Sequence, residues 1–154
     1  MKTDANNLNT FIDLLESEWE KDSVINIKDL IEAEIETARL HAKYINYSTK
    51  AKRLLAQLEY DFNILRGKKS SYYRGKLSKK ELDLENWKPF QYVLKTKGEI
   101  DEVMSFDDDI NEVAKLIALT NSIIEMCDSC LYNIRQRTFQ IKNIIEIKKF
   151  EAGI

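Results

Sequence analysis

Residues 30–65 read LIEAEIETARLHAKYINYSTKAKRLLAQLEYDFNIL, and the spacing of their apolar side chains indicates the main element of the fold. Steps of three and four residues from Leu30 to Leu65 visit eleven positions, nine of which carry apolar or tyrosine side chains. This spacing is typical of a helix with one apolar seam, because a helical turn takes 3.6 residues. We therefore expect a helix from about Lys28 to about Leu65, roughly 55 Å long at ~1.5 Å per residue.

A second seam of the same kind lies in the last third of the chain. It selects, at the same spacing, Ile110, Val113, Ile117, Thr120, Ile124, Cys127, Leu131, Ile134, Thr138, Ile141 and Ile145. Three aspartates at 107–109 precede it, where carboxylates cap free backbone N–H groups. A long amphipathic helix needs a partner of similar length to cover its seam. The sequence thus predicts an antiparallel or slightly splayed hairpin of two helices packed as a coiled coil.

A short acidic helix is expected in residues 1–27, marked by apolar side chains at helical spacing: Leu8, Phe11, Ile12, Leu15 and Trp19. We expect Asn7 or Asn9 to cap this helix. Its glutamates Glu16, Glu18 and Glu20 are interpreted either as an exposed surface for a partner or as a merely solvated face.

The segment 81–106 breaks the helical pattern and contains Pro89 and Gly98. Tyr92–Leu94 and Ile100–Met104 are candidates for short strands joined by a turn at Lys97–Gly98, and an irregular arm is the alternative. The chain is therefore expected to be a single, mainly α domain. Its parts are a short N-terminal helix, a long helix with a basic stretch, a partly extended connecting segment and a C-terminal oligomerisation helix: 1–27, 28–80, 81–106 and 107–154.

Charge is strongly segregated along the chain, although the net charge is only -2. Residues 37–80 hold twelve bases and two acids, whereas residues 1–36 hold ten acids and three bases. Residues 81–154 hold fourteen acids and nine bases. Such segregation costs self-repulsion in the middle block. It is typical of a protein with a polyanionic partner or an acidic protein partner.

The basic block ends in a stretch from Arg66 to Lys80 that contains seven bases and no acid. Tyr72 and Tyr73 lie in its middle, and Gly67 and Gly75 flank the cluster. Cations that follow the backbone and aromatic rings that stack on bases are what single-stranded nucleic acid requires. A solvated loop and an acidic protein partner are the alternatives. The candidate DNA-binding residues are Arg66, Lys68, Lys69, Tyr72, Tyr73, Arg74 and Lys76.

Catalytic and metal sites are not expected. Cys127 and Cys130 form only half of a zinc motif. A nucleophilic cysteine or serine would need a histidine as its base, and the sequence has a single histidine, His41. Four scattered glycines cannot form a phosphate-binding loop. The chain is interpreted as a non-enzyme without cofactor or metal. Two cysteines, a polar N-terminus and no apolar run near ~18 residues favour a cytoplasmic protein that does not enter membranes.

The end of the C-terminal helix is apolar nearly all the way round, which is typical of a helix that packs against another chain. The candidate oligomerisation residues are Phe139, Ile141, Ile144, Ile145 and Phe150. Packing on the chain's own first helix, through Leu8, Phe11 and Leu15, is the alternative.

At these two features the sequence resembles the UvsY-like recombination mediators of T-even-type bacteriophages. The sharper likeness is at the end of the chain, in Arg135, Phe139, Ile141, Lys142, Ile145 and Phe150–Gly153. The second is the basic run into Tyr72–Tyr73, followed by Gly75. A weaker likeness covers Tyr92–Asp109 and the helix after it, so the resemblance spans most of the chain from about Leu30.

The resemblance implies a protein that binds single-stranded DNA and loads a RecA-like recombinase onto strands covered by single-strand-binding protein. It implies rings of six or seven subunits, seven being favoured, formed through the C-terminal helix, and no catalytic site. In the host cell such a phage protein acts in the cytoplasm. A non-catalytic coiled-coil adaptor whose basic loop binds an acidic protein is the alternative function.

The family's basic pair falls on Lys69 and Gly67, so Arg66 or Lys68 must supply the second charge. Two further departures from the family pattern stand out. The chain ends in Ile154 rather than in basic residues, and its acidic N-terminal segment is longer.

Overall fold

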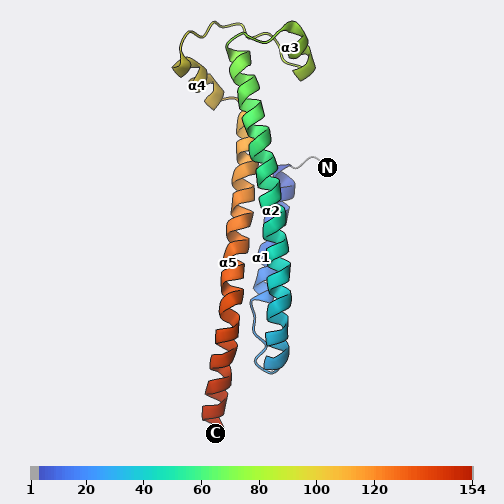
Figure 1. Ribbon diagram of the computed structural model, residues 1–154, viewed down its shortest axis with the longest axis vertical. Coiled ribbons are helices and arrows are strands. Elements are labelled where there is room, and N and C mark those ends of the chain that lie inside the picture. The colour runs from blue at the N-terminus through green and yellow to red at the C-terminus, as the bar shows by residue number, and fades with distance from the viewer. Residues whose placement is uncertain (1–3, 154) are drawn as a thin grey trace. The chain divides into compact units, whose positions relative to one another are not determined.

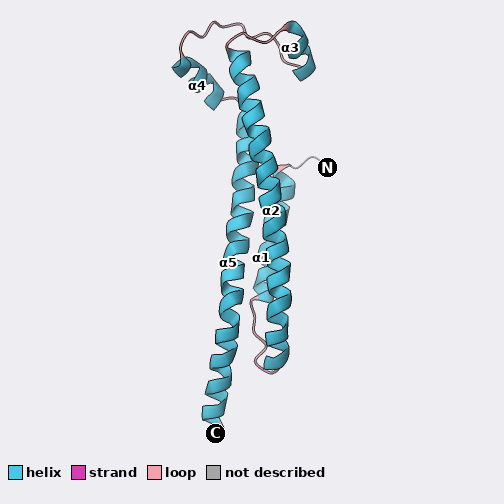
Figure 2. Ribbon diagram, viewed as in Figure 1, coloured by secondary structure: helices cyan, strands magenta, loops and turns pink. Residues whose placement is uncertain are grey.

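A computed structural model describes residues 4–153, which form five helices and contain no strand (Figures 1 and 2). The mainly α class is therefore confirmed. The helices are α1 (Ala5–Asp22), α2 (Leu30–Tyr73), α3 (Lys79–Glu85), α4 (Lys97–Ser105) and α5 (Asp108–Glu151). The described helices form two compact units. The first, here the bundle unit, comprises Met1–Leu55 and Leu119–Ile154, and the second, here the aromatic unit, comprises Ala56–Ala118.

In the bundle unit α2 and α5 pair in antiparallel fashion. Thr138 donates a hydrogen bond to Glu34 (3.0 Å), and Ser48 donates one to Asp128 (3.3 Å). Residue numbers therefore increase along α2 in the direction in which they decrease along α5. The side chains buried between the helices come from both predicted seams: Leu40, Tyr44, Ala51, Cys127, Leu131, Ile134 and Ile141. Both seams were thus predicted correctly from their spacing, and the hairpin's antiparallel pairing is confirmed within this unit.

Helix α1 packs along the same unit through Leu15, which is fully buried, and through Trp19, whose ring meets that of Tyr44 edge-on at 5.3 Å between centroids. Asp22 accepts hydrogen bonds from Tyr44 (3.1 Å) and Lys43 (2.7 Å). Burial and the neighbouring Asp22 carboxylate raise the pKa of Tyr44. The first helix thus covers the hairpin of its own chain beside Tyr44, whereas Phe139 and Phe150 near the end of α5 stay exposed.

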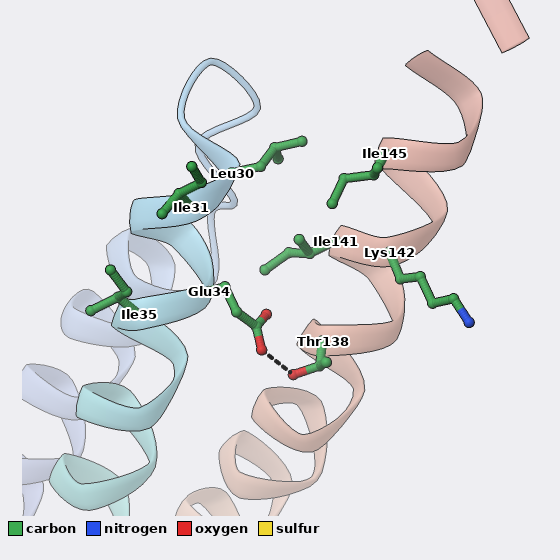
Figure 3. A pocket seen from close by; sticks show the side chains of 8 residues that line it. All are labelled: Leu30, Ile31, Glu34, Ile35, Thr138, Ile141, Lys142 and Ile145. Atoms are coloured by element: carbon green, nitrogen blue, oxygen red, sulfur yellow. Dashed lines mark hydrogen bonds between the residues drawn. The ribbon is translucent and has the colours of Figure 1, made fainter. Parts of the chain in front are cut away.

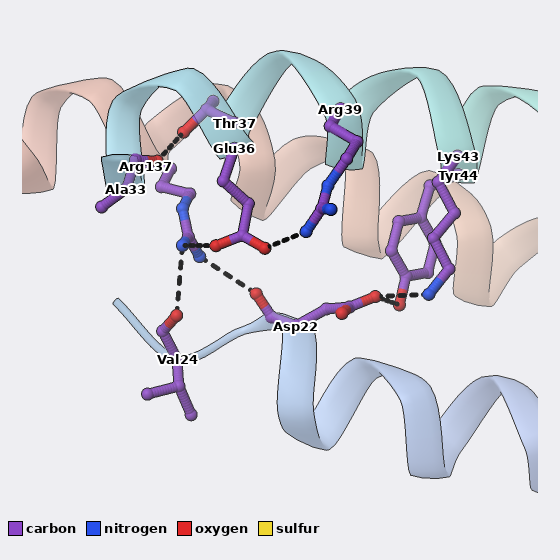
Figure 4. A network of polar contacts seen from close by, with 9 residues as sticks. All are labelled: Asp22, Val24, Ala33, Glu36, Thr37, Arg39, Lys43, Tyr44 and Arg137. Atoms are coloured by element: carbon purple, nitrogen blue, oxygen red, sulfur yellow. Dashed lines mark hydrogen bonds and ion pairs between the residues drawn. The ribbon is translucent and has the colours of Figure 1, made fainter. Parts of the chain in front are cut away.

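Arg137 of α5 closes the C-terminal end of α1 (Figure 4). Its guanidinium, only 3% exposed, donates to the carbonyl oxygens of Asp22 (3.0 Å), Ser23 (3.4 Å) and Val24 (3.1 Å). It also lies 3.8 Å from the Glu36 carboxylate. The last carbonyl oxygens of a helix have no hydrogen-bond donor within the helix, and burying them without a donor costs free energy. Arg137 supplies the missing donors.

The structure corrects two expectations for α1. Asp4, rather than Asn7 or Asn9, caps α1, because its Oδ1 accepts from the backbone N–H of Asn7 at 2.8 Å. Glu18 is not a free surface acid, because it accepts from Tyr47 (3.1 Å) and pairs with Lys43 (3.0 Å). Neither Asn could compete for the cap, since both lie inside the helix that Asp4 begins.

Helix α2 continues to Tyr73, about two turns beyond the expected end near Leu65. It ends where Gly75 takes a positive φ of 65°, a conformation that favours glycine. The N–H of Lys76 then donates to Ser71 (2.9 Å) and that of Gly75 to Tyr72 (2.9 Å), which is the Schellman pattern. Ten of the fifteen residues of the basic stretch are therefore helical, eight of them in α2 and two in α3, and not part of a loop.

The expected strand at Ile100–Met104 is wrong, because these residues lie in α4. Thr96 accepts from the backbone N–H of Glu99 (3.2 Å), and the Glu99 carboxylate accepts from the N–H of Thr96 (2.8 Å). This capping box starts a helix at Lys97, and it excludes the turn proposed at Lys97–Gly98. Tyr92–Leu94 is irregular rather than a strand.

Cys127 and Cys130 are free thiols buried in the bundle unit, as the packing interpretation predicted. Burial raises the pKa of each to about 11. No helix formed by residues 4–153 is both long and apolar enough to cross a membrane. The same residues hold no group of three histidine, cysteine or acidic side chains able to bind a metal.

Candidate nucleic-acid interface

The paired tyrosines of the basic stretch belong to the core of the aromatic unit. The ring of Tyr73 meets that of Phe90 edge-on at 4.9 Å, and the ring of Tyr72 lies 5.2 Å from that of Trp87. The Tyr72 hydroxyl donates to the carbonyl of Lys88 (2.8 Å). Tyr73 is buried together with Ile100, Met104 and Ile110. The predicted stacking rings are therefore occupied by contacts within the chain.

Lys69 is also used internally. It is 6% exposed, and its ammonium lies 2.9 Å from Asp107 Oδ2 and 2.5 Å from Asp109 Oδ2. Burial alone lowers the pKa of Lys69, but hydrogen bonds and attraction from Asp109 and Asp107 outweigh it and raise that pKa. The ammonium also lies 4.4 Å from the centre of the Trp87 ring. Lys69 thus holds the end of α2 against the start of α5 and is not free to meet a phosphate.

Asp107 is the centre of this cluster. It caps α5 by accepting from the N–H of Ile110 (3.1 Å), and it accepts from the Tyr73 hydroxyl (2.6 Å). Burial alone raises the pKa of Asp107, but the hydrogen bonds from Tyr73, Lys69 and Ile110 and the attraction of Lys69 lower it below its ordinary value. The interpretation of the 107–109 aspartates as a helix start is confirmed, with Asp107 as the cap.

The remaining cations of the stretch face solvent. Lys68 forms an ion pair with Glu85 of α3, and both side chains are partly exposed. The other five are exposed and form no ion pair with a carboxylate of residues 4–153: Arg66, Arg74, Lys76, Lys79 and Lys80. Arg74 and Lys76 occupy the turn between α2 and α3, and Lys79 and Lys80 lie in the first turn of α3. Four exposed cations thus lie within seven consecutive residues there.

An exposed aromatic ring that the sequence interpretation missed is Tyr92. It is 73% exposed, and its ring lies 5.7 Å from that of Phe90, so one face remains open to solvent. Lys88 and Lys95, both exposed, lie on either side of it in the chain. A tyrosine between two lysines carries the same signal as the basic stretch, and this signal is visible in the sequence.

Some of the candidate oligomerisation residues are buried within the chain, and others are exposed to solvent. Ile141 is 3% exposed and faces α2 within the chain, whereas Phe139, Ile145 and Phe150 are exposed. Ile144 is half-buried. An apolar groove of about 410 Å³ lies between the start of α2 and the end of α5 (Figure 3). Its lining comprises Leu30, Ile31, Glu34, Ile35, Thr138, Ile141, Lys142 and Ile145.

Comparisons with known proteins agree with this architecture. Three crystal structures of the bacteriophage T4 recombination mediator protein UvsY, in lattice types II, I and IV, have TM-scores of 0.78, 0.75 and 0.75. Their identities to this chain are 24%, 22% and 22%, and they cover 91%, 89% and 90% of it. The alignments cover 96%, 98% and 97% of those chains. These likenesses show a shared fold.

Sequence comparison gives the same family. The recombination protein uvsY of Enterobacteria phage T4 is 24% identical over 139 residues, which are 90% of this chain and 96% of that protein. Residues 18–154 match the family described as recombination, repair and ssDNA binding protein UvsY. The expected resemblance is therefore confirmed over most of the chain, and the chain belongs to the UvsY family of recombination, repair and single-stranded-DNA-binding proteins.

Proposed function

We propose that this chain is a non-catalytic recombination mediator. It binds single-stranded DNA and promotes loading of a RecA-like recombinase onto strands coated by single-strand-binding protein. The observation that carries the proposal is the group of exposed cations without carboxylate partners, Arg66, Arg74, Lys76, Lys79 and Lys80. Family membership, in which single-stranded DNA binding is part of the description, supports it.

The positions of these cations favour an anionic partner. Lys79 and Lys80 lie in the first turn of α3, where the helix dipole favours acids and disfavours bases. This arrangement costs stability in the free protein, and phosphate groups would remove that cost. Neutralising about five phosphates of a single strand gives a slope of log K against log salt of roughly -3.5.

A ring would turn one modest patch into a strong binding surface. When several copies of the cation group on one ring bind the same strand, the overall affinity exceeds the single-site affinity ~10²–10⁴-fold. The exposed apolar side chains Phe139, Ile147 and Phe150 and the groove of about 410 Å³ offer an apolar surface for a second copy. We place this surface between subunits of a six- or seven-membered ring, with seven favoured.

The test is recombinase loading on single strands coated with single-strand-binding protein. The full chain is added to a RecA-like recombinase, and the recombinase's DNA-dependent ATPase activity is followed. The expected result is a shorter lag with the wild-type chain and little shortening with the double variant Arg74→Ala/Lys76→Ala. The matched control Lys50→Ala/Arg53→Ala removes the same two charges from exposed positions of the bundle unit.

Three outcomes would contradict the proposal or part of it. An unchanged lag with the wild-type chain would remove the mediator role. Equal shortening by both double variants would move the DNA-binding surface away from Arg74 and Lys76. A chain that binds no oligo-dT at low salt but binds an acidic protein would favour the adaptor function instead.

A further inference from the structure

The aromatic unit contains a pocket of about 390 Å³ that the cation group does not explain. It is bounded by α2, α4 and α5, and its size is within the range of roughly 300–1,000 Å³ typical of small-ligand sites. Three of its lining side chains are apolar, namely Phe62, Met104 and Ile110. Met104 and Ile110 are buried and Phe62 is half-buried. The pocket therefore offers an apolar wall that is part of the core of the unit.

Charged groups of both signs line the same pocket. Arg66 and Lys97 are exposed cations, and Asp101 is an exposed carboxylate. None of these three forms an ion pair with another side chain of residues 4–153. The Arg66 guanidinium lies 5.7 Å from the centre of the Phe62 ring, so the cation is held at the edge of the apolar wall. Charged groups that share a pocket without pairing are available to a ligand with both donors and acceptors.

A nucleotide has this combination of features. Its base is flat and apolar on its faces, its phosphate is anionic, and the edges of adenine, cytosine and guanine carry an amino group. A carboxylate accepts hydrogen bonds from such an amino group, as in contacts between acidic side chains and cytosine N4. Thymine has no exocyclic amino group, so an aspartate at the edge of the pocket disfavours it.

We infer that this pocket receives one nucleotide of the bound single strand. Its base lies against Phe62, Met104 and Ile110, its phosphate meets Arg66 and Lys97, and Asp101 accepts from the amino group of the base. This inference rests on the proposed function and adds to it a binding subsite and a base preference. Arg66 is then shared between the cation group and the pocket.

The test compares short oligo-dC and oligo-dT strands of equal length by fluorescence anisotropy at pH 8, with the full chain in each case. One charge-assisted hydrogen bond corresponds to a preference of about tenfold for oligo-dC. Asp101→Asn is expected to reduce that preference to near unity. Glu102→Gln is the matched control, because it removes the same charge from the next, exposed position, which does not line the pocket.

A second variant, Ser105→Trp, fills the pocket from its exposed edge. It is expected to lower the affinity for oligo-dC to that for oligo-dT without changing the thermal midpoint of the chain. Equal affinity of the wild type for both strands, or a preference that survives in Asp101→Asn, would overturn the subsite alone. A wild type that binds neither strand would contradict the proposed function as well. Free dCMP that binds the chain without lowering its strand affinity would assign the pocket to a free nucleotide and overturn the strand subsite.

Discussion

The buried ammonium of Lys69 lies 2.9 Å from Oδ2 of Asp107, the residue that caps α5. The same carboxylate oxygen accepts the Tyr73 hydroxyl at 2.6 Å. Two residues of the basic stretch thus converge on one buried acid from the start of another helix. The stretch therefore has two roles: Lys69 and Tyr73 hold the aromatic unit together, while Arg66, Arg74 and Lys76 face solvent.

Replacing Lys69 by methionine removes the ammonium and leaves the Asp107 carboxylate buried without its cation. Loss of one partner of a buried pair costs about 3 kcal/mol or more. We expect the free energy of unfolding of Lys69→Met to fall by about that amount in urea denaturation. Lys68→Ala removes a neighbouring lysine with a partly exposed partner, Glu85, and is expected to cost less than about 1 kcal/mol. Equal losses in the two variants would contradict the structural role of Lys69.

The stability of the chain should fall in acid through Asp107. Its pKa is below its ordinary value of 3.8 in the folded chain, so its contribution is present above that value and disappears as the pH falls through the lowered pKa. Asp107→Asn is expected to be less stable than the wild type at pH 7 and to lose less stability between pH ~5 and ~2. Glu81 and Glu99 also have lowered pKa values, so some acid dependence remains in the variant. Parallel stability curves for the two proteins would rule out this role.

Gly67 lies inside α2 at an exposed position, and a Cβ atom built there meets nothing within 4 Å. Glycine in a helix interior costs roughly 0.8–1 kcal/mol relative to alanine. Gly67→Lys is expected to raise the free energy of unfolding by about 0.5 kcal/mol and to add a cation beside Arg66 and Lys68. The salt slope for oligo-dT binding should steepen by about 0.7. Gly67→Ala should raise stability without that change in slope, and an unchanged slope in Gly67→Lys would place the strand elsewhere.

The proposed ring depends on the exposed apolar end of α5. Ile147 and Phe150 are 58% and 85% exposed, and aspartates at both positions would put charge into an apolar contact. Light scattering should give six or seven times 18.1 kDa for the wild type and the single-chain mass for Ile147→Asp/Phe150→Asp. Leu84→Asp, which changes an equally exposed residue of α3, should keep the wild-type mass. A wild-type monomer, or an unchanged mass for the double variant, would contradict the ring.

The two long helices could be predicted because a seam at helical spacing is a local signal. Leu40 and Tyr44 of one seam and Cys127 and Ile134 of the other are all buried as expected. The boundaries were harder to predict. The end of α2 depends on a left-handed Gly75, ten residues beyond the last seam position. In α4, by contrast, Thr96 and Glu99 form a capping box that is visible in the sequence, and the strand interpretation overlooked it.

The candidate site could be predicted as a segment but not residue by residue. Seven bases among fifteen residues identify the segment that contains the cation group from composition alone. Sequence gives no sign that Lys69 pairs with Asp109, forty residues away, because that contact exists only when α2 and α5 pack. For the same reason the aromatic contacts of Tyr72 with Trp87 emerge only from the fold, whereas the position of Tyr92 between Lys88 and Lys95 is already visible in the sequence.

The most direct test of the account is the salt dependence of oligo-dT binding by Arg74→Ala/Lys76→Ala, measured by anisotropy beside Lys69→Met and the wild type. Each lost phosphate contact reduces the slope of log K against log salt by about 0.7, so the double variant should be shallower by about 1.4. Folded Lys69→Met should keep the wild-type slope, since its ammonium already pairs with Asp107 and Asp109. A wild-type slope for the double variant, together with a shallower slope for Lys69→Met, would contradict the division of roles within the basic stretch.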